Sequence, residues 1–142
     1  MAGIRSKNTR PEIMIRKALF KKGFRYRLHS EALPGKPDLV LPKYRAVIFV
    51  NGCFWHGHDC HMFRLPRTRT EFWAAKILRN QQRDIAVRQQ LQQAKWRSLT
   101  IWECAVRGRG NLGLDQVTFE TSAWLLGSAA NLEIRGKSHG HS

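Results

Sequence analysis

The chain has 142 residues with 25 Lys and Arg against 10 Asp and Glu, a formal net charge of +15 and a pI of about 10.9. This length corresponds to one domain, and a 42% hydrophobic share with seven Phe and five Trp excludes a disordered chain. The charge predicts a polyanionic partner, with nucleic acid favoured over an anionic membrane or a merely solvated surface. No stretch approaches the roughly 18 apolar residues of a membrane span, and no signal peptide is recognisable, which favours a cytoplasmic protein.

The first predicted element is a helix that begins after Thr9. Pro11 and Glu12 are typical of a first turn, with Glu12 closing a capping box, and Gly23 ends the helix. Apolar and basic residues then alternate over 24–29, which predicts a half-buried strand.

Two prolines and a glycine predict a turn at 33–37, followed by strands over 38–41 and 45–50. The second strand is continuously apolar, which favours burial on both faces and a central place in the sheet. The loop over 51–70 carries three of the six histidines. A loop of this length is usually functional or tied down by contacts.

The longest predicted helix covers 71–95, and a strand over 96–102, a Gly- and Arg-rich loop and a last helix over 115–126 follow. Four apolar residues of the long helix are expected to face the core: Trp73, Ile77, Ile85 and Leu91. The order of elements predicts one mixed α/β domain over 1–127, and the polar tail 128–142 is expected to be disordered.

A metal site is indicated by Cys53, His58 and Cys60, which form the pattern C-x4-H-x-C on the long loop. Zinc takes thiolate and imidazole ligands in a tetrahedron, and Cys104 is the one cysteine left to complete it. A structural zinc is favoured over three buried thiols because a long irregular loop needs a staple. Other ligand combinations stay open because two further histidines lie nearby: His56 and His61.

A second chemistry is indicated at Asp38, which follows Pro37 and opens a strand. Metal-dependent phosphodiester hydrolysis needs a carboxylate at such a fixed position, and the Pro-Asp step resembles that of restriction-endonuclease-like nucleases. The Glu-x-Lys that these nucleases usually carry on the next strand is missing here. The backbone carbonyl of Val50 is a candidate ligand in its place, since Mg²⁺ accepts any hard oxygen.

Five segments together resemble the very short patch repair (Vsr) mismatch endonucleases, and the resemblance extends over about 5–126. They are residues 33–38, 47–49, 52–60, 67–73 and 102–105. The resemblance implies a restriction-endonuclease-like α/β domain with a central mixed sheet flanked by helices and a structural zinc loop. It further implies a monomer that uses Mg²⁺ to nick double-stranded DNA beside a T·G mismatch, in a bacterial cytoplasm, with mismatch-repair factors as further partners.

The resemblance also implies a role for particular residues. Asp38 and the Val50 carbonyl would bind Mg²⁺, His56 would act as general base, and Glu12 would reach the metal-bound waters. The implied zinc ligands are Cys53, His58, Cys60 and Cys104. The implied wedge that enters the base stack is aromatic and consists of Phe54, Trp55 and Trp73.

Each role has an alternative. Glu12 can be a helix-capping residue, His56 a zinc ligand or an exposed side chain, and Trp73 a core residue. One of the adjacent Phe54 and Trp55 can likewise be buried in the core. Asn51 stands where the family usually has a second active-site histidine, and an amide cannot shuttle a proton.

Three functions are therefore weighed. The leading one is a mismatch-directed nicking endonuclease. The second is a restriction-type or mobile-element nuclease that cuts matched DNA on the same scaffold. The third is a zinc-stabilised DNA-binding module whose catalysis is weakened by Asn51.

Overall fold

One five-stranded sheet of order β1-β2-β3-β4-β5 organises the fold in the computed structural model, which describes residues 8–137. The strands are β1 (Arg27–Leu28), β2 (Leu39–Leu41), β3 (Ala46–Asn51), β4 (Arg97–Trp102) and β5 (Asn131–Ile134). The first three pair antiparallel, whereas β4 runs parallel to β3 and β5 runs parallel to β4. The predicted mixed α/β sheet is confirmed.

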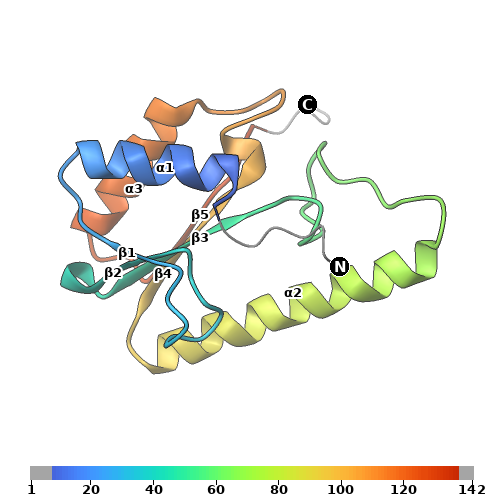
Figure 1. Ribbon diagram of the computed structural model, residues 1–142, viewed down its shortest axis with the longest axis horizontal. Helices are drawn as coiled ribbons and strands as arrows, with labels where there is room; N and C mark the ends of the chain where they lie inside the picture. Colours follow the sequence, from blue (N-terminus) through green and yellow to red (C-terminus); the bar gives the residue numbers. More distant parts are fainter. Residues whose placement is uncertain (1–7, 138–142) are drawn as a thin grey trace.

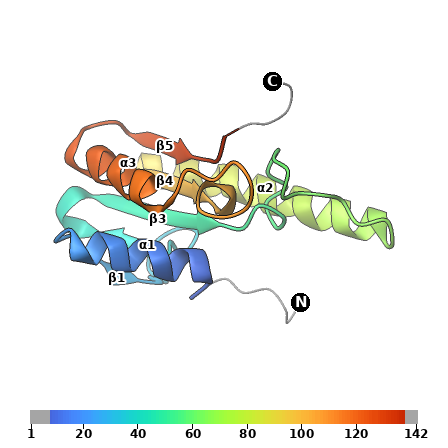
Figure 2. The same ribbon diagram turned by 90° about the horizontal axis from the view of Figure 1, so that it is seen from above.

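Helices cover both faces of this sheet. The α-helices are α1 (Arg10–Lys21), α2 (Thr70–Gln93) and α3 (Leu114–Leu126), and the short 3₁₀ turns are η1 (Pro42–Tyr44) and η2 (Glu103–Ala105). α1 and α3 lie side by side on one face, and α2 crosses the other (Figures 1 and 2). None of the helices between residues 8 and 137 has the length and apolar character of a membrane span.

The two faces of β3 contribute to two different cores. Ile48 packs with Ile15 and Leu99 beneath α1 and α3, whereas its neighbour Val47 packs with Leu91 of α2. Ile48 and Val47 are both fully buried, because successive side chains of a strand point to opposite faces. The prediction of a central strand buried on both faces is thereby confirmed.

The start of α1 differs in detail from a reciprocal capping box. The Thr9 hydroxyl accepts a hydrogen bond from the backbone N–H of Glu12 at 3.4 Å. The Glu12 carboxylate accepts instead from the backbone N–H of Asn8 at 2.9 Å, one residue earlier than the box requires. Glu12 thus caps the chain just before the helix, and its second oxygen is left for other partners.

Two expectations about individual elements are wrong. The strand expected over 24–29 shrinks to two residues, because His29 adopts a left-handed φ of 50° and ends the pairing. Ile85 is 50% exposed instead of packing in the core, since α2 runs past the edge of the core and turns this residue toward β4 and β5.

The helix α2 is longer than the sheet is wide. Its 24 residues span about 36 Å, and its first half projects beyond the strands beside the loop of residues 51–70 (Figure 1). This projection gives the molecule a second lobe that is built from one helix and one loop.

The tail prediction is also wrong for the residues that form β5. Leu132 pairs with Leu99 of β4, and Ile134 is 2% exposed within the core beneath α1 and α3. Only two apolar residues alternate with Asn131 and Glu133, so the strand signal is short and the segment reads as polar. Residues 138–142 of the expected tail lie outside the described part of the chain.

Ile134→Ala is expected to lower the free energy of unfolding by about 2–4 kcal/mol, because it empties a closed position in the core. Urea unfolding monitored by tryptophan fluorescence measures the change. Leu126→Ala is the matched control, because Leu126 is 70% exposed, and it should cost much less. Equal effects for the two variants would show that β5 is peripheral to the fold.

Candidate functional site

Strand register places the site at one edge of the sheet. Asn51, the last residue of β3, is paired in register with Trp102, the last residue of the parallel strand β4. Cys53 and Cys104 each follow two residues later, so 50 residues of intervening chain do not separate them in space. β2 runs antiparallel to β3, which brings Asp38 at its start to the same edge.

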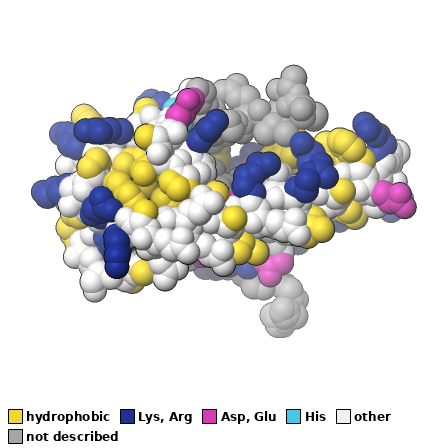
Figure 3. Space-filling view, turned by 90° about the horizontal axis from the view of Figure 1, so that it is seen from below, with side chains coloured by type: hydrophobic (Ala, Val, Ile, Leu, Met, Phe, Trp, Pro, Cys, Tyr) yellow, Lys and Arg dark blue, Asp and Glu magenta, His cyan; other side chains and the backbone are white. Residues whose placement is uncertain are grey.

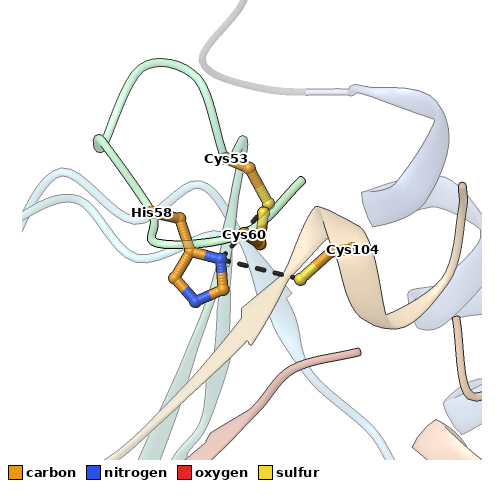
Figure 4. Close-up of side chains that lie close together, drawn as sticks. All are labelled: Cys53, His58, Cys60 and Cys104. Atoms are coloured by element: carbon orange, nitrogen blue, oxygen red, sulfur yellow. Dashed lines mark hydrogen bonds between the residues drawn. The ribbon is translucent and has the colours of Figure 1, made fainter. Parts of the chain in front are cut away.

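The four predicted zinc ligands converge at this edge (Figure 4). The ligand atoms of Cys53, His58, Cys60 and Cys104 all lie within 4.8 Å of one another, and three of the four side chains are buried. His58 Nδ1 is 3.6 Å from the sulfur of Cys53 and 3.6 Å from that of Cys104.

These distances fit zinc, the metal predicted for this cluster. Tetrahedral zinc with bonds of about 2.3 Å to sulfur and 2.0–2.1 Å to nitrogen separates the two ligand atoms by roughly 3.6 Å. A hydrogen bond with Cys104 and burial raise the pKa of Cys53, and the same hydrogen bond lowers the pKa of Cys104. The cluster is therefore consistent with a structural zinc site.

His56 is oriented away from this cluster. Its Nδ1 lies 2.5 Å from the Oδ2 of Asp84 on α2, and its ring meets that of Trp102 edge-on at 5.9 Å. A carboxylate that binds Nδ1 fixes the tautomer, so the proton sits on Nδ1 and Nε2 is free to accept one. His56 is thus not among the four clustered ligand residues, and its role as a base stays a prediction.

The main chain around His56 is held by α2. Gln81 donates to the carbonyl oxygens of His56 and Gly57, at 3.2 and 3.3 Å, and Asn80 donates to that of Trp55 at 2.8 Å. Gly57 has a φ of +58°, and a Cβ there would lie 2.6 Å from both Gln81 and Ile77. The residue must be glycine for the loop to lie this close to the helix.

A cleft of about 710 Å³ contains both Asp38 and the His56–Asp84 pair. Its walls are the start of α1, the ends of β2 and β3, and the middle of α2. Its lining includes Asp38, Val50 and Asn51, together with His56 and Asp84.

Asp38 lies in this cleft as a mostly buried carboxyl group. Its Oδ2 accepts the backbone N–H of Val50 at 2.7 Å. Burial and, to a smaller extent, the nearby carboxylate of Glu12 raise the pKa of Asp38 to about 7, although that hydrogen bond lowers it. Asp38 thus holds a proton near neutrality unless a cation takes its place.

Glu12 is held beside Asp38 by contacts with two side chains. Its Oε2 lies 2.8 Å from Arg16 and 2.6 Å from His29, and its side chain is 1% exposed. Glu12, His29 and Asp38 hold their ligand atoms within 4.8 Å of one another, a spacing that a metal ion can bridge. Glu12 therefore caps the chain and lies beside Asp38, and its role toward metal-bound water stays a prediction.

The three predicted wedge residues form one aromatic cluster. Phe54 lies 5.0 Å from Trp55 and 5.6 Å from Trp73 between ring centroids, and Trp55 lies 5.7 Å from Trp73. All three are half-buried in the projecting lobe, outside the cores on the two faces of the sheet. Phe63 joins them at 5.9 Å from Phe54. Neither Trp73 nor Phe54 belongs to the main core.

Positive charge surrounds the cleft and follows α2. Figure 3 shows Lys and Arg side chains along this helix, with few acidic side chains between them. The basic residues that line the cleft are Arg10, Lys76, Arg83 and Arg107. Such a surface attracts the phosphates of a nucleic acid.

Sequence reasoning missed Asp84, His29 and Glu103. Glu103 accepts the backbone N–H of Cys53 at 3.2 Å and pairs with Arg107 at 2.8 Å, which ties the zinc loop to η2. Asp84 lies among Arg and Gln on a polar helix, and His29 follows a short strand. Their sequence neighbours give no sign of these contacts, which only the folded chain creates.

Comparisons with known proteins identify the family of this chain. A family model described as DNA mismatch endonuclease Vsr matches residues 1–62. The chain is 42% identical to the DNA mismatch endonuclease Vsr of Escherichia coli (strain K12) over 134 residues, which cover 94% of this chain and 86% of that protein.

Two further relatives are named type II nicking enzymes. V.NmeAIP of Neisseria meningitidis serogroup A is 43% identical over 109 residues, which cover 77% of this chain and 78% of the relative. V.XorIIP of Xanthomonas oryzae pv. oryzae is 46% identical over 112 residues, with 79% and 82% covered.

The class of protein that fold, site and relatives define is a DNA-nicking endonuclease. Within that class, the chain belongs to the Vsr family of DNA mismatch endonucleases.

Asp38→Asn is expected to stabilise the protein in buffer without added divalent cations, by roughly 2–4 kcal/mol at pH 8. The pKa of Asp38 is about 7 in the folded protein, above its ordinary 3.8, so the folded state holds an extra proton between these values. Wild-type stability therefore falls as the pH rises from about 4 to 7, and the amide removes this loss.

Urea unfolding at pH 5 and pH 8 measures the difference, which should be larger at pH 8. Glu31→Gln is the control, because Glu31 is exposed and lies outside the cleft. An Asp38→Asn protein with the same advantage at both pH values would contradict the burial of a charge at this position.

Proposed function

We propose that this chain is a Mg²⁺-dependent endonuclease that nicks one strand of double-stranded DNA beside a T·G mismatch. The observation that carries the proposal is the shared cleft: Asp38, the His56–Asp84 pair and Trp55 of the aromatic cluster all line the same cavity. An acidic group, a base and an unstacking surface thus meet at one place.

Asp38 and the Val50 carbonyl are the proposed ligands of Mg²⁺. Asp38 and Glu12 are two mostly buried carboxyl groups close to each other, and a dication offsets their repulsion where a proton otherwise does. When bound, Mg²⁺ supplies positive charge that polarises the scissile phosphate. Glu12, clamped by Arg16 and His29, is placed to accept hydrogen bonds from water in the cleft.

His56 is the proposed general base. Because Asp84 accepts the proton of Nδ1, Nε2 can take the proton of an attacking water, and Asp84 stabilises the imidazolium that results. Asn51 at the end of β3 lines the same cleft and can donate a hydrogen bond to a phosphate oxygen or a water. It cannot carry charge, so the phosphate depends on the arginines and Lys76 around the cleft for neutralisation.

The aromatic cluster is the proposed wedge. Its rings project on the second lobe beside the cleft, where an apolar surface that is only half-buried can enter between base pairs. Unstacking a step costs a few kcal/mol, and a mismatched pair lowers that cost, which favours a T·G site over a matched one.

A second candidate is a nicking activity that does not require the mismatch. Two relatives at 43% and 46% identity carry the name type II nicking enzyme, whereas the Escherichia coli relative is named a mismatch endonuclease. A restriction-type or mobile-element nuclease on matched DNA and a DNA-binding module weakened by Asn51 are the remaining readings.

The deciding experiment is Mg²⁺-dependent nicking of a labelled duplex with one T·G mismatch, beside its T·A control. We expect a nick in the mismatched duplex alone. Cleavage of both duplexes would favour the second candidate. Cleavage of neither by the natural chain, with cleavage by an Asn51→His variant, would mean that the site is complete except for this residue.

Asp38→Ala is expected to abolish nicking, by at least about 10³-fold, while DNA binding changes by less than about tenfold. The phosphate contacts that dominate affinity come from basic residues elsewhere on the cleft. Single-turnover cleavage and a binding titration at one salt concentration measure the two effects. A cleaving Asp38→Ala protein would refute the assignment of the metal site.

A further inference from the structure

The segment that follows β5 runs along the outside of the zinc cluster. Figure 2 shows the end of β5 beside the loop of residues 103–113. Two hydrogen bonds donated by backbone N–H groups join the two segments. The N–H of Gly136 donates to the sulfur of Cys104 at 3.4 Å, and the N–H of Lys137 donates to the carbonyl of Gly110 at 2.7 Å. Within β5 itself, Glu133 accepts the indole N–H of Trp102 at 3.1 Å.

The contact at Cys104 is possible only because residue 136 is glycine. A Cβ at this position would lie 2.3 Å from the carbonyl oxygen of Cys104 and 2.9 Å from that of Gly110. Both are backbone atoms and have no flexible end that could move aside. There is therefore no room for a side chain at residue 136 when its N–H lies this close to the sulfur. A thiolate bound to zinc accepts such a hydrogen bond.

A second contact lies behind His58. The Nδ1 of His58 faces the cysteines, whereas its Nε2 is buried and makes no hydrogen bond within the described residues. The nearest acidic oxygen is Oδ1 of Asp59, at 3.7 Å. A histidine that binds zinc through one nitrogen usually donates the other N–H to a carboxylate, which orients the ring and raises its basicity.

Arg135 holds Asp59 in that position. Its guanidinium donates to Oδ1 of Asp59 at 2.6 Å and to the backbone carbonyl of the same residue at 2.9 Å. Asp59 is 83% exposed, so no packing fixes it and Arg135 is the group that does. An ion pair this exposed contributes little to the free energy of folding. What this ion pair does for the metal site is to place the Asp59 carboxylate near His58.

We propose that residues 133–137 form an outer support of the zinc site, with Arg135 and Gly136 as positioning residues for His58 and Cys104. Zinc retention and the docking of β5 are then one coupled unit: a chain whose C-terminal segment is released loses zinc faster, and a chain that loses zinc releases β5. The inference depends on the zinc site alone and stands whether or not the proposed nuclease activity is found.

The test measures zinc release from the full-length protein to a chromogenic chelator. Arg135→Gln and Asp59→Asn are each expected to release zinc about 10-fold faster or more, the range by which outer partners of metal ligands change affinity. Both residues are exposed enough that the variants should fold, which circular dichroism verifies. Lys137→Gln is the matched control, because its side chain is exposed and contacts none of these groups, and its release rate should equal that of wild type.

Hydrogen exchange tests the reciprocal effect. After chelation of zinc from the wild-type protein, the amides of residues 131–134 are expected to lose protection together with those of 53–60, while the amides of β3 keep it. Wild-type release rates in both Arg135→Gln and Asp59→Asn would overturn the proposal. So would β5 amides that stay as protected without zinc as with it.

Discussion

The parallel pairing of β3 with β4 is the constraint on which the rest of the site depends. Its register aligns Asn51 with Trp102, so both strands end at the same level of the sheet. Two residues beyond these ends, Cys53 and Cys104 meet without any further adjustment. Parallel strands need a long crossover, and here that crossover contains both the zinc loop and α2. One pairing event therefore sets the metal ligands, the catalytic loop and the helix that carries Asp84.

The cleft brings two acidic side chains together in a mostly buried position, which is electrostatically unfavourable. Two carboxyl groups with little exposure, Asp38 and Glu12, lie near each other, and Glu12 contacts the side chains of Arg16 and His29. The pKa of Asp38 rises to about 7 as a result of burial and of this neighbour. A site of this kind has a lower free energy with a cation than without one, which is the property that a metal-dependent nuclease requires.

The loop between β3 and α2 is irregular, yet it is supported from three directions. The zinc cluster joins it to the end of β4, Asn80 and Gln81 bind its carbonyl groups from α2, and Arg135 reaches it from the far edge of the sheet. These supports are needed because the loop carries His56 and part of the aromatic cluster, whose positions decide the chemistry. A long loop with so few internal hydrogen bonds would otherwise lack a fixed geometry.

The sequence by itself determined the elements and the residue types of the site. Periodicity and turn chemistry predicted α1, α2, α3 and strands β2 to β4 to within a few residues, and the C-x4-H-x-C spacing predicted three members of the metal cluster. These signals are local: a capping residue, an apolar run or a ligand triplet acts within one turn or one loop, so adjacent residues suffice to reveal them.

Only the tertiary structure decided the partners that lie far apart in the chain. Asp84 is 28 residues from His56, and Arg135 is 76 residues from Asp59, and nothing in either neighbourhood marks the pairing. β5 was hidden for the same reason: four residues with two apolar side chains form a strand only because β4 offers an open parallel edge. Contacts of this kind depend on register and packing of the whole sheet, which no single segment encodes.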